Sequence, residues 1–236
     1  SRLRTCLLPS LIRAKTYNMN HGVEQVKIFE IAKIYLAGEK LPEEKTCLSI
    51  LADIDYLTLK GIVESLLLNL GIISKCEWMI FGGSILFKAD RSAKIQFGNN
   101  VLGYIGEDKE LELKTSPCMV ELDMCLLVKM SNFSKKYHAL SQYPPVLRDL
   151  AIIVDEEVTW ASIEKCIAAA NVSFMTAINF FDIYRGKQIP SGKKSIAFNL
   201  CFQAQDRTLR SEEVDAAQEK ILNALQKTLG GELRKQ

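Results

Sequence analysis

The clearest indication of the fold is in residues 194–203, which read KSIAFNLCFQ. Large apolar residues alternate here with small or polar ones, a pattern that predicts a strand with one apolar face. The apolar set is Ile196, Phe198, Leu200 and Phe202, and the opposite set is Ala197, Asn199, Cys201 and Gln203. Helices can therefore cover only one face of the sheet that holds this strand, and the other face is left open for a partner.

The elements predicted around this strand alternate in type. Strands are predicted at residues 147–154 and 174–184, and a short last strand at 232–235. Helices are predicted at 159–170, with Thr159 as N-cap, and after Ser211 as N-cap, ending at Gly230-Gly231. The resulting order, β-α-β-β-α-β, is that of a ferredoxin-like fold with both helices on one face of the sheet.

The first half of the chain mixes helices with strands. Helices are predicted at 7–17 and 57–70, strands at 26–36 and 120–129, and a hairpin at 95–105. This mixture predicts an α+β module with an antiparallel sheet. Periodicity weakens at residues 131–141, so we expect two domains, 1–140 and 141–236.

Composition limits the class of protein. The chain has 236 residues, 48% of them hydrophobic and 25% charged, and a net charge of +2, as in soluble globular proteins. No apolar run approaches the roughly 20 residues that a membrane span needs. The seven cysteines form no Cys-x-x-Cys pair, which favours a reducing cytoplasm. The two histidines, His21 and His138, are far apart in sequence, so no metal site is expected. Because the chain starts at Ser1 without a methionine, we interpret it as a piece of a longer protein.

Motifs for catalysis are missing from the sequence. It contains no glycine-rich phosphate loop and no Gly-x-Ser-x-Gly nucleophile turn. The acidic pairs, such as Asp53 with Asp55, adjoin turn signals and are interpreted as solvated charges. On these grounds the chain is predicted to be non-catalytic.

A basic stretch follows the second strand of the second half. Residues 185–205 include Arg185, Lys187, Lys193 and Lys194 and no acidic residue. Beside an exposed Phe181 or Tyr184, such a hairpin can bind RNA phosphates while a ring stacks on a base. The alternative is a solvated surface loop with ordinary lysines.

Four motifs of the second half resemble a known family. They are Tyr143-Pro144 with Arg148-Asp149, Phe181-Asp182-Ile183-Tyr184-Arg185-Gly186, Gly192-Lys193-Lys194-Ser195, and Asp206-Arg207-Thr208-Leu209 before a Glu-rich helix. In this order they resemble the ferredoxin-fold anticodon-binding domain that closes the β subunit of bacterial phenylalanyl-tRNA synthetases. The resemblance covers residues 141–234.

The first half resembles the synthetase-like module of the same subunit. The similar segments are residues 3–11, Tyr17-Asn18, residues 28–31, Arg91-Ser92-Ala93, residues 102–106 and residues 120–123. In that family the module has a class II synthetase fold without the catalytic residues, and it packs on the α subunit. Lys88-Ala89-Asp90 replaces the usual His-Pro-Gly before Arg91, which is a local departure.

The resemblance implies a function. The family attaches L-phenylalanine to tRNA(Phe) using ATP and magnesium, in a cytoplasmic α2β2 heterotetramer whose active site is on the α subunit. This piece alone is then expected to be inactive, to hold no cofactor or metal, and to position the anticodon end of the tRNA. The residues expected to bind RNA are Arg148, Phe181, Asp182, Tyr184, Arg185, Lys193, Lys194 and Arg207.

Two other functions stay open at this point. The ferredoxin-like domain can be a regulatory module that binds a small metabolite or a protein on its open sheet face. The first half can be a stand-alone enzyme, although the missing phosphate loop and nucleophile argue against this.

Overall fold

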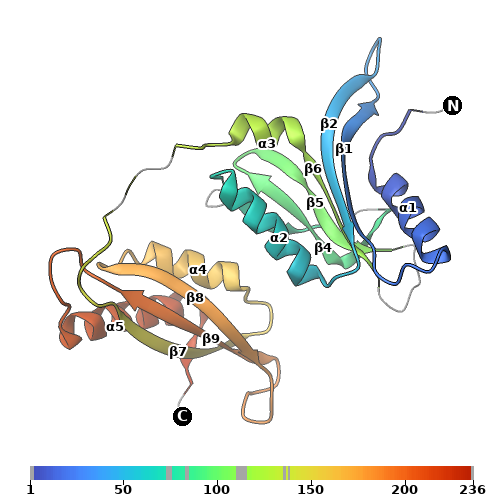
Figure 1. Cartoon of the computed structure of the whole chain (residues 1–236). Coiled ribbons are helices and arrows are strands. Elements are labelled where there is room, and N and C mark those ends of the chain that lie inside the picture. Colours follow the sequence, from blue (N-terminus) through green and yellow to red (C-terminus); the bar gives the residue numbers. More distant parts are fainter. Residues whose placement is uncertain are drawn as a thin grey trace. The chain divides into compact units, whose positions relative to one another are not determined.

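The computed structural model describes residues 3–72, 76–82, 85–109, 116–134, 137 and 139–234. The chain divides into two compact units, Ser1–Lys136 and Tyr137–Gln236 (Figure 1). The division falls within residues 131–141, where the hydrophobic periodicity is weak. Each unit has its own sheet and its own hydrophobic core.

The first unit is built on a six-stranded sheet. Its elements are α1 (Leu8–Asn20), β1 (Lys27–Leu36), β2 (Glu43–Ala52), α2 (Tyr56–Asn69), β3 (Cys76–Ile80), β4 (Phe87–Phe97), β5 (Asn100–Asp108), β6 (Cys118–Asp123) and α3 (Met124–Met130). The strand order is β1-β2-β6-β5-β4-β3, and all neighbours are antiparallel. The α+β prediction for this half of the chain is therefore confirmed.

Helices cover both faces of this first sheet. Leu59 of α2 and Leu127 of α3 pack in one cluster with Ile50 of β2. Leu11 of α1 packs in a different cluster with Leu51, the next residue of β2. Successive side chains of a strand point to opposite faces, so α1 lies on the face opposite to α2 and α3.

One predicted strand in the first unit is wrong in its second half. The strand expected at 120–129 ends at Asp123, and residues 124–130 form α3. The carboxylate of Asp123 accepts a hydrogen bond from the Leu126 backbone N–H at 2.9 Å and so caps the helix. The helix therefore begins at this cap, and the apolar residues after Asp123 belong to α3 and not to the strand.

The second unit has the predicted β-α-β-β-α-β order. Its elements are β7 (Val146–Asp155), α4 (Trp160–Ala169), β8 (Met175–Tyr184), β9 (Lys193–Phe202), α5 (Ser211–Leu229) and β10 (Glu232–Leu233). The sheet order is β10-β7-β9-β8 with antiparallel neighbours. The third strand of the unit, β9, thus pairs with both the first and the second, as in a ferredoxin-like fold, which confirms the prediction.

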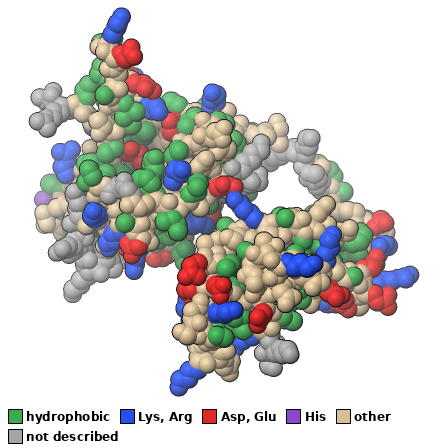
Figure 2. All heavy atoms as spheres, turned by 180° about the vertical axis from the view of Figure 1, so that it is seen from behind, with side chains coloured by type: hydrophobic (Ala, Val, Ile, Leu, Met, Phe, Trp, Pro, Cys, Tyr) green, Lys and Arg blue, Asp and Glu red, His purple; other side chains and the backbone are tan. Residues whose placement is uncertain are grey.

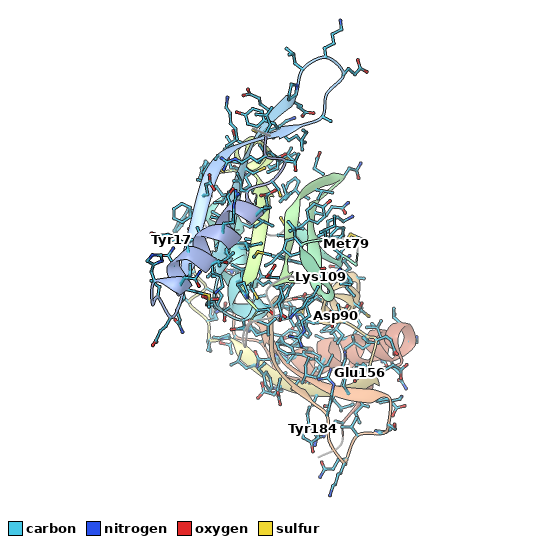
Figure 3. All side chains as sticks on the ribbon, turned by 90° about the vertical axis from the view of Figure 1, so that its right-hand side faces the viewer. Tyr17, Met79, Asp90, Lys109, Glu156 and Tyr184 are labelled. Atoms are coloured by element: carbon cyan, nitrogen blue, oxygen red, sulfur yellow. The ribbon has the colours of Figure 1, made fainter. Side chains whose placement is uncertain are left out.

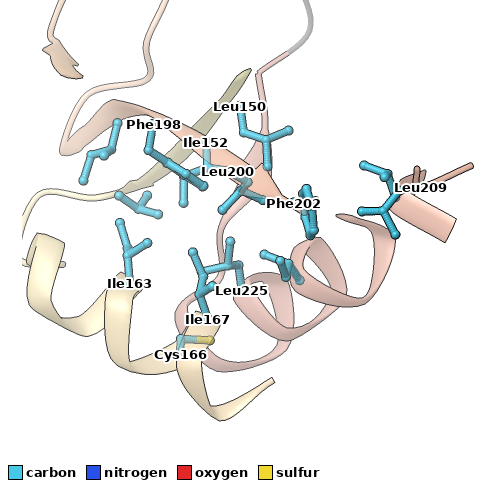
Figure 4. Close-up of a cluster of buried hydrophobic side chains, with 14 of the residues drawn as sticks. Leu150, Ile152, Ile163, Cys166, Ile167, Phe198, Leu200, Phe202, Leu209 and Leu225 are labelled. Atoms are coloured by element: carbon cyan, nitrogen blue, oxygen red, sulfur yellow. The ribbon is translucent and has the colours of Figure 1, made fainter. Parts of the chain in front are cut away.

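Both helices of the second unit pack on the same face of its sheet. Phe198 and Leu200 of β9 share one buried cluster with Ile167 of α4 and Leu225 of α5. Figure 4 shows these side chains directed at one another between the strands and the two helices. The prediction that one face carries both helices is confirmed.

The helix ends in this unit were predicted with mixed success. Thr159 caps α4, as expected, because its hydroxyl accepts a hydrogen bond from the Ser162 N–H. Gly230 ends α5 with a φ of 62°, a conformation that glycine adopts without strain. Ser211 is not the N-cap of α5: the cap is Arg210, whose backbone N–H is bound by the Glu213 carboxylate at 2.9 Å. None of the helices in the described part of the chain is both long enough and apolar enough to span a membrane.

Candidate nucleic-acid interface

The sheet of the second unit has one face that no helix of the described residues covers. Directly paired residues of an antiparallel sheet point to the same side, so the register identifies the side chains on this face. Along β7, β9 and β8 they form four rows: Leu147, Cys201 and Ala177; Asp149, Asn199 and Asn179; Ala151, Ala197 and Asp182; Ile153, Ser195 and Tyr184. We call these residues the open face.

The middle of the open face is made of small and polar side chains. Ala151 pairs directly with Ala197, and in the next row the Asn199 amide donates to the Asp149 carboxylate at 2.7 Å. Side chains this short leave a floor close to the backbone, with amide and carboxylate groups beside it. A flat, hydrogen-bonding ring such as a nucleobase fits a surface of this kind.

A β-bulge decides which residues of β8 reach the open face. Phe180 pairs with Phe198 on the helix side, and its ring lies 5.4 Å from that of Trp160. The register then shifts, and Asp182 pairs with Ala197. The extra residue, Phe181, is 57% exposed. Because the bulge reverses the alternation, Asp182 and Tyr184 point to the open face instead of the core.

Tyr184 closes one end of the open face. Its ring lies beneath the guanidinium of Arg234, with 4.8 Å between Arg234 Cζ and the ring centroid. Its hydroxyl end lies so near Gly186 that a Cβ at this position would force the Tyr184 side chain to move. Ser195, its neighbour on β9, is only 2% exposed. An aromatic ring and a hydroxyl therefore lie side by side at this end.

Three basic residues of the β8–β9 hairpin contact the end of β7 or the residue that follows it. Arg185 binds Glu156 through two nitrogens at 3.0 and 2.5 Å, and this hydrogen bonding lowers the pKa of Glu156. Lys193 Nζ lies 3.7 Å from Asp155. Lys194 points to the opposite face, is 8% exposed and donates to the Glu156 carbonyl at 2.7 Å. Figure 3 labels Glu156 and Tyr184 in this unit.

Two further residues that were predicted to bind RNA contact helix α5. Arg148 lies on the helix-facing side of β7 and contacts Asp215 of α5 at 3.1 Å. Arg207 binds both carboxylate oxygens of Glu213, at 2.8 and 2.6 Å. The hydrogen bonds from Arg207 and the Arg210 backbone lower the pKa of Glu213 to about 2. Arg207 therefore supports the cap of α5.

The structure thus divides the predicted RNA-binding residues among three places. Phe181, Asp182, Tyr184, Arg185 and Lys193 lie on or beside the hairpin end of the open face. Lys194 faces the core, and Arg148 and Arg207 lie toward the opposite end of the sheet, where they bind α5. At about 3.3 Å per residue, the ten residues of β9 separate the two ends by roughly 30 Å.

Sequence reasoning missed two members of this region, Arg234 and Ser195. A short strand at 232–235 was predicted, but not the strand with which it would pair. In a ferredoxin-like order, the last strand lies beside the first, which would have brought Arg234 to the open face. Ser195 follows from the alternation in β9 once Tyr184 is known to pair with it.

Most of the basic residues that are predicted to bind RNA are paired with acidic side chains. In the view of Figure 2, basic and acidic side chains are interspersed over the visible surface of each unit. Arg148, Arg185, Lys193 and Arg207 each have a carboxylate partner. These four residues therefore do not form a broad basic patch of unpaired charges.

The first unit has a charged cleft of about 840 Å³. At its floor Lys15 of α1 forms an ion pair with Asp53, and the two side chains are 2% and 9% exposed. The interpretation of Asp53 as a solvated charge is therefore wrong, because α1 covers it. On the cleft wall, Arg91 and Lys88 share Glu107 at 2.8 and 3.4 Å. Lys15 and Asp53 balance one another, whereas Arg91 and Lys88 share a single carboxylate.

Comparisons with known proteins assign both units. Residues 141–234 match the family described as "Ferredoxin-fold anticodon binding domain". Residues 1–124, just over half of the chain, match "Phenylalanyl tRNA synthetase beta chain CLM domain". The two matches follow the same order along the chain as the two units of the structure.

Whole-chain relatives agree. The chain is 34% identical to the phenylalanine–tRNA ligase β subunit of Clostridium acetobutylicum over 244 residues, covering 99% of this chain and 31% of the relative. It is 31% identical to that of Geobacillus kaustophilus and 30% to that of Bacillus subtilis, covering 99% of this chain and 32% of each relative. The chain spans about a third of the length of these curated relatives.

A solved structure of a pyrrolysyl tRNA synthetase from Desulfitobacterium hafniense aligns with a TM-score of 0.44 at 16% identity, covering 54% of this chain and 48% of that one. So distant a likeness carries no argument. The family matches cover both units, and they show that the chain belongs to the phenylalanyl-tRNA synthetase β-chain family.

Proposed function

We propose that the second unit binds the anticodon end of tRNA(Phe) on its open face. It would do so within a phenylalanyl-tRNA synthetase, the cytoplasmic enzyme that attaches L-phenylalanine to tRNA(Phe) using ATP and magnesium. The proposal is supported by the anticodon-binding family match of residues 141–234 and by the chemistry of the open face.

One observation carries the proposal. The β8 bulge turns Asp182 and Tyr184 onto the open face, beside the small side chains of Ala197 and Ser195. Unpaired bases of RNA loops are recognised by stacking on aromatic rings and by hydrogen bonds to their edges. Tyr184 offers the ring, Asp182 offers carboxylate acceptors, and the small, partly exposed Ala197 leaves room for a base.

Two predicted basic residues fit this arrangement as phosphate partners. Arg185 and Lys193 lie at the Tyr184 end of the sheet, and each contacts an exposed carboxylate, Glu156 and Asp155 respectively. An RNA phosphate can replace such a partner, because exposed ion pairs in water are weak. Lys194 is left out of the contact set because it faces the core.

The mechanism of the proposed function is positioning. Contacts at the anticodon would hold the tRNA so that its acceptor end reaches an active site on the α subunit of an α2β2 enzyme. Residues 1–140 would then be a class II synthetase-like module without catalytic residues, which joins the β subunit to α.

The test is a fluorescence-anisotropy titration of the chain with an anticodon stem-loop of tRNA(Phe) at two salt concentrations. A stem-loop with a scrambled loop is the RNA control. We expect tighter binding of the cognate loop, reduced by Tyr184→Ala by roughly tenfold or more, since stacking of one base contributes about 1–3 kcal/mol. Equal binding of both loops, or no effect of Tyr184→Ala, would contradict the proposal. A rise in melting temperature with phenylalanine but not with RNA would favour a metabolite-binding module.

A further inference from the structure

Arg234 has a fixed backbone and a side chain that reaches across the sheet. Its backbone N–H donates to the Ala151 carbonyl at 2.8 Å, next to the pairing of Leu233 with Ile152. Arg234 therefore shares the open-face side of β7 with Ala151. Its guanidinium lies over the Tyr184 ring, 4.8 Å from the centroid.

The charge of Arg234 is not balanced by a carboxylate within the residues that the structure describes. Its one side-chain hydrogen bond there goes to the neutral amide oxygen of Gln188, at 2.8 Å. In this it differs from Arg185 and Lys193, which both contact carboxylates. A guanidinium has five N–H donors in a planar fork, so among the described residues most of these donors have no partner.

The position of Arg234 also affects stacking on Tyr184. In the unliganded chain the guanidinium occupies one face of the ring, through a cation–π contact. A base that stacks on this face must take the place of the guanidinium. The displaced group would remain tethered next to β10 by the Arg234 backbone hydrogen bond to Ala151.

We propose that Arg234 is a further RNA-contacting residue. Its guanidinium leaves the Tyr184 ring when a base stacks there and binds a backbone phosphate beside that base. Phosphate is the anion that the planar fork binds in a bidentate manner. This inference rests on the proposed function, since it assigns Arg234 to the same open face.

The experiment compares Arg234→Gln with Lys227→Gln in anisotropy titrations of the anticodon stem-loop over a series of salt concentrations. Lys227 is exposed in the last turn of α5, so its variant removes one charge from the same part of the chain. We expect Arg234→Gln to weaken binding roughly tenfold, as for the loss of a charged hydrogen bond. The slope of log affinity against log salt should fall by about 0.7, the value for one phosphate contact on a single strand. Lys227→Gln should change neither quantity.

Arg234→Lys is a second variant, which distinguishes loss of the phosphate contact from misfolding of the domain. It keeps the charge without the planar fork, so it should keep the wild-type salt slope with an intermediate affinity. Arg234→Gln binding with the wild-type slope, or more tightly than wild type, would overturn the role of Arg234 alone. A lysine variant with the slope of Arg234→Gln would do the same. If the unchanged chain fails to distinguish cognate from scrambled loop, the proposed function fails, and this inference with it.

Discussion

The two sheets of this chain differ in what covers them. In the first unit, helices pack on both faces, with α1 on one side and α2 and α3 on the other. In the second, both helices pack on one side, and the described residues leave the other side open. Both sheets are antiparallel, so strand pairing does not explain the difference. The difference comes from the side chains on one face of each sheet: the face under α1 in the first unit and the open face in the second.

Two central strands make this plain. In β2, Leu48 and Leu51 are both buried although they point to opposite faces. In β9, Phe198 is fully buried, while its neighbours Ala197 and Asn199 are small or polar and partly exposed. A strand that is apolar on both sides is an internal structural element, whereas a strand with one small, polar side leaves a surface for a partner.

Each unit carries one of the two tryptophans, which allows its stability to be followed separately. Trp78 packs at the edge of the first core, and Trp160 packs against Phe198 in the second. A chain with Trp160→Phe therefore reports unfolding of the first unit, and one with Trp78→Phe reports unfolding of the second.

The largest expected effect is at the buried ion pair that α1 brings to the first sheet. Lys15→Met leaves the Asp53 carboxylate without its cation beneath α1. Breaking a buried pair in this way should cost about 3–5 kcal/mol in the free energy of unfolding. The measurement is urea unfolding of the first unit followed by Trp78 fluorescence.

A matched control is Lys33→Met, which breaks an exposed pair with Glu44. It should leave the unfolding midpoint nearly unchanged. If the two variants unfolded at the same urea concentration, α1 would not bury this face of the sheet in solution.

The next prediction compares two leucines: Leu51, on the face of the first sheet that α1 covers, and Leu147, on the open face of the second sheet. Leu51→Ala removes a side chain packed under α1 and should cost about 2–5 kcal/mol. Leu147→Ala trims a side chain on the open face that is 58% exposed, and should cost less than about 1 kcal/mol. Urea unfolding of each unit by its own tryptophan gives both values. A large loss at Leu147 would mean that this face is covered after all.

A smaller effect separates the two faces of β9 within one sheet. Lys193→Met on the open side should reduce the salt slope of stem-loop binding by about 0.7, with little change in melting temperature. Lys194→Met removes a core-facing ammonium that binds the Glu156 carbonyl, so it should change stability and leave the salt slope alone. The same salt series of anisotropy titrations, with melting curves, measures both. The reverse pattern would contradict the assignment of faces.

The smallest effect concerns the end of the second sheet where Arg207 holds Glu213. The pKa of Glu213 is about 2 in the folded chain, below the ordinary value of 4.5. A folded-state pKa that is depressed contributes stability above about pH 4.5, and this contribution is lost as the pH falls toward about 2. Unfolding of wild type and Glu213→Gln, measured through that range, should show a shallower loss for the variant. Parallel curves would show that Arg207 is free for another partner.

Sequence patterns predicted the fold where alternation and capping agreed. The alternation of residues 194–203 correctly indicated a strand with one apolar face, and Thr159 correctly marked the start of α4. The prediction failed at residues 124–130, where an apolar run suited strand and helix equally and only the Asp123 cap distinguished them.

The candidate site was less predictable than the fold, because it depends on pairing between distant strands. The bulge at Phe181 that turns Asp182 outward depends on the register with β9, which the sequence does not display. Lys193 and Lys194 are neighbours of one type, yet they point to opposite faces. Arg207 has the residue type of a phosphate contact, but its partner Glu213 lies one helical turn into α5 and holds it there. The register and the bulge depend on tertiary contacts, whereas the opposite faces of Lys193 and Lys194 follow from the alternation in β9.

The central claim is that RNA binds the open face of the second unit and not its helices. The most direct test is to map backbone amide chemical shifts of the ¹⁵N-labelled chain during titration with the anticodon stem-loop. The account predicts that the largest shifts occur at Ala151, Ala197, Asn199 and Tyr184, with small changes along the solvent sides of α4 and α5. Large shifts confined to the two helices, with an unchanged open face, would contradict it.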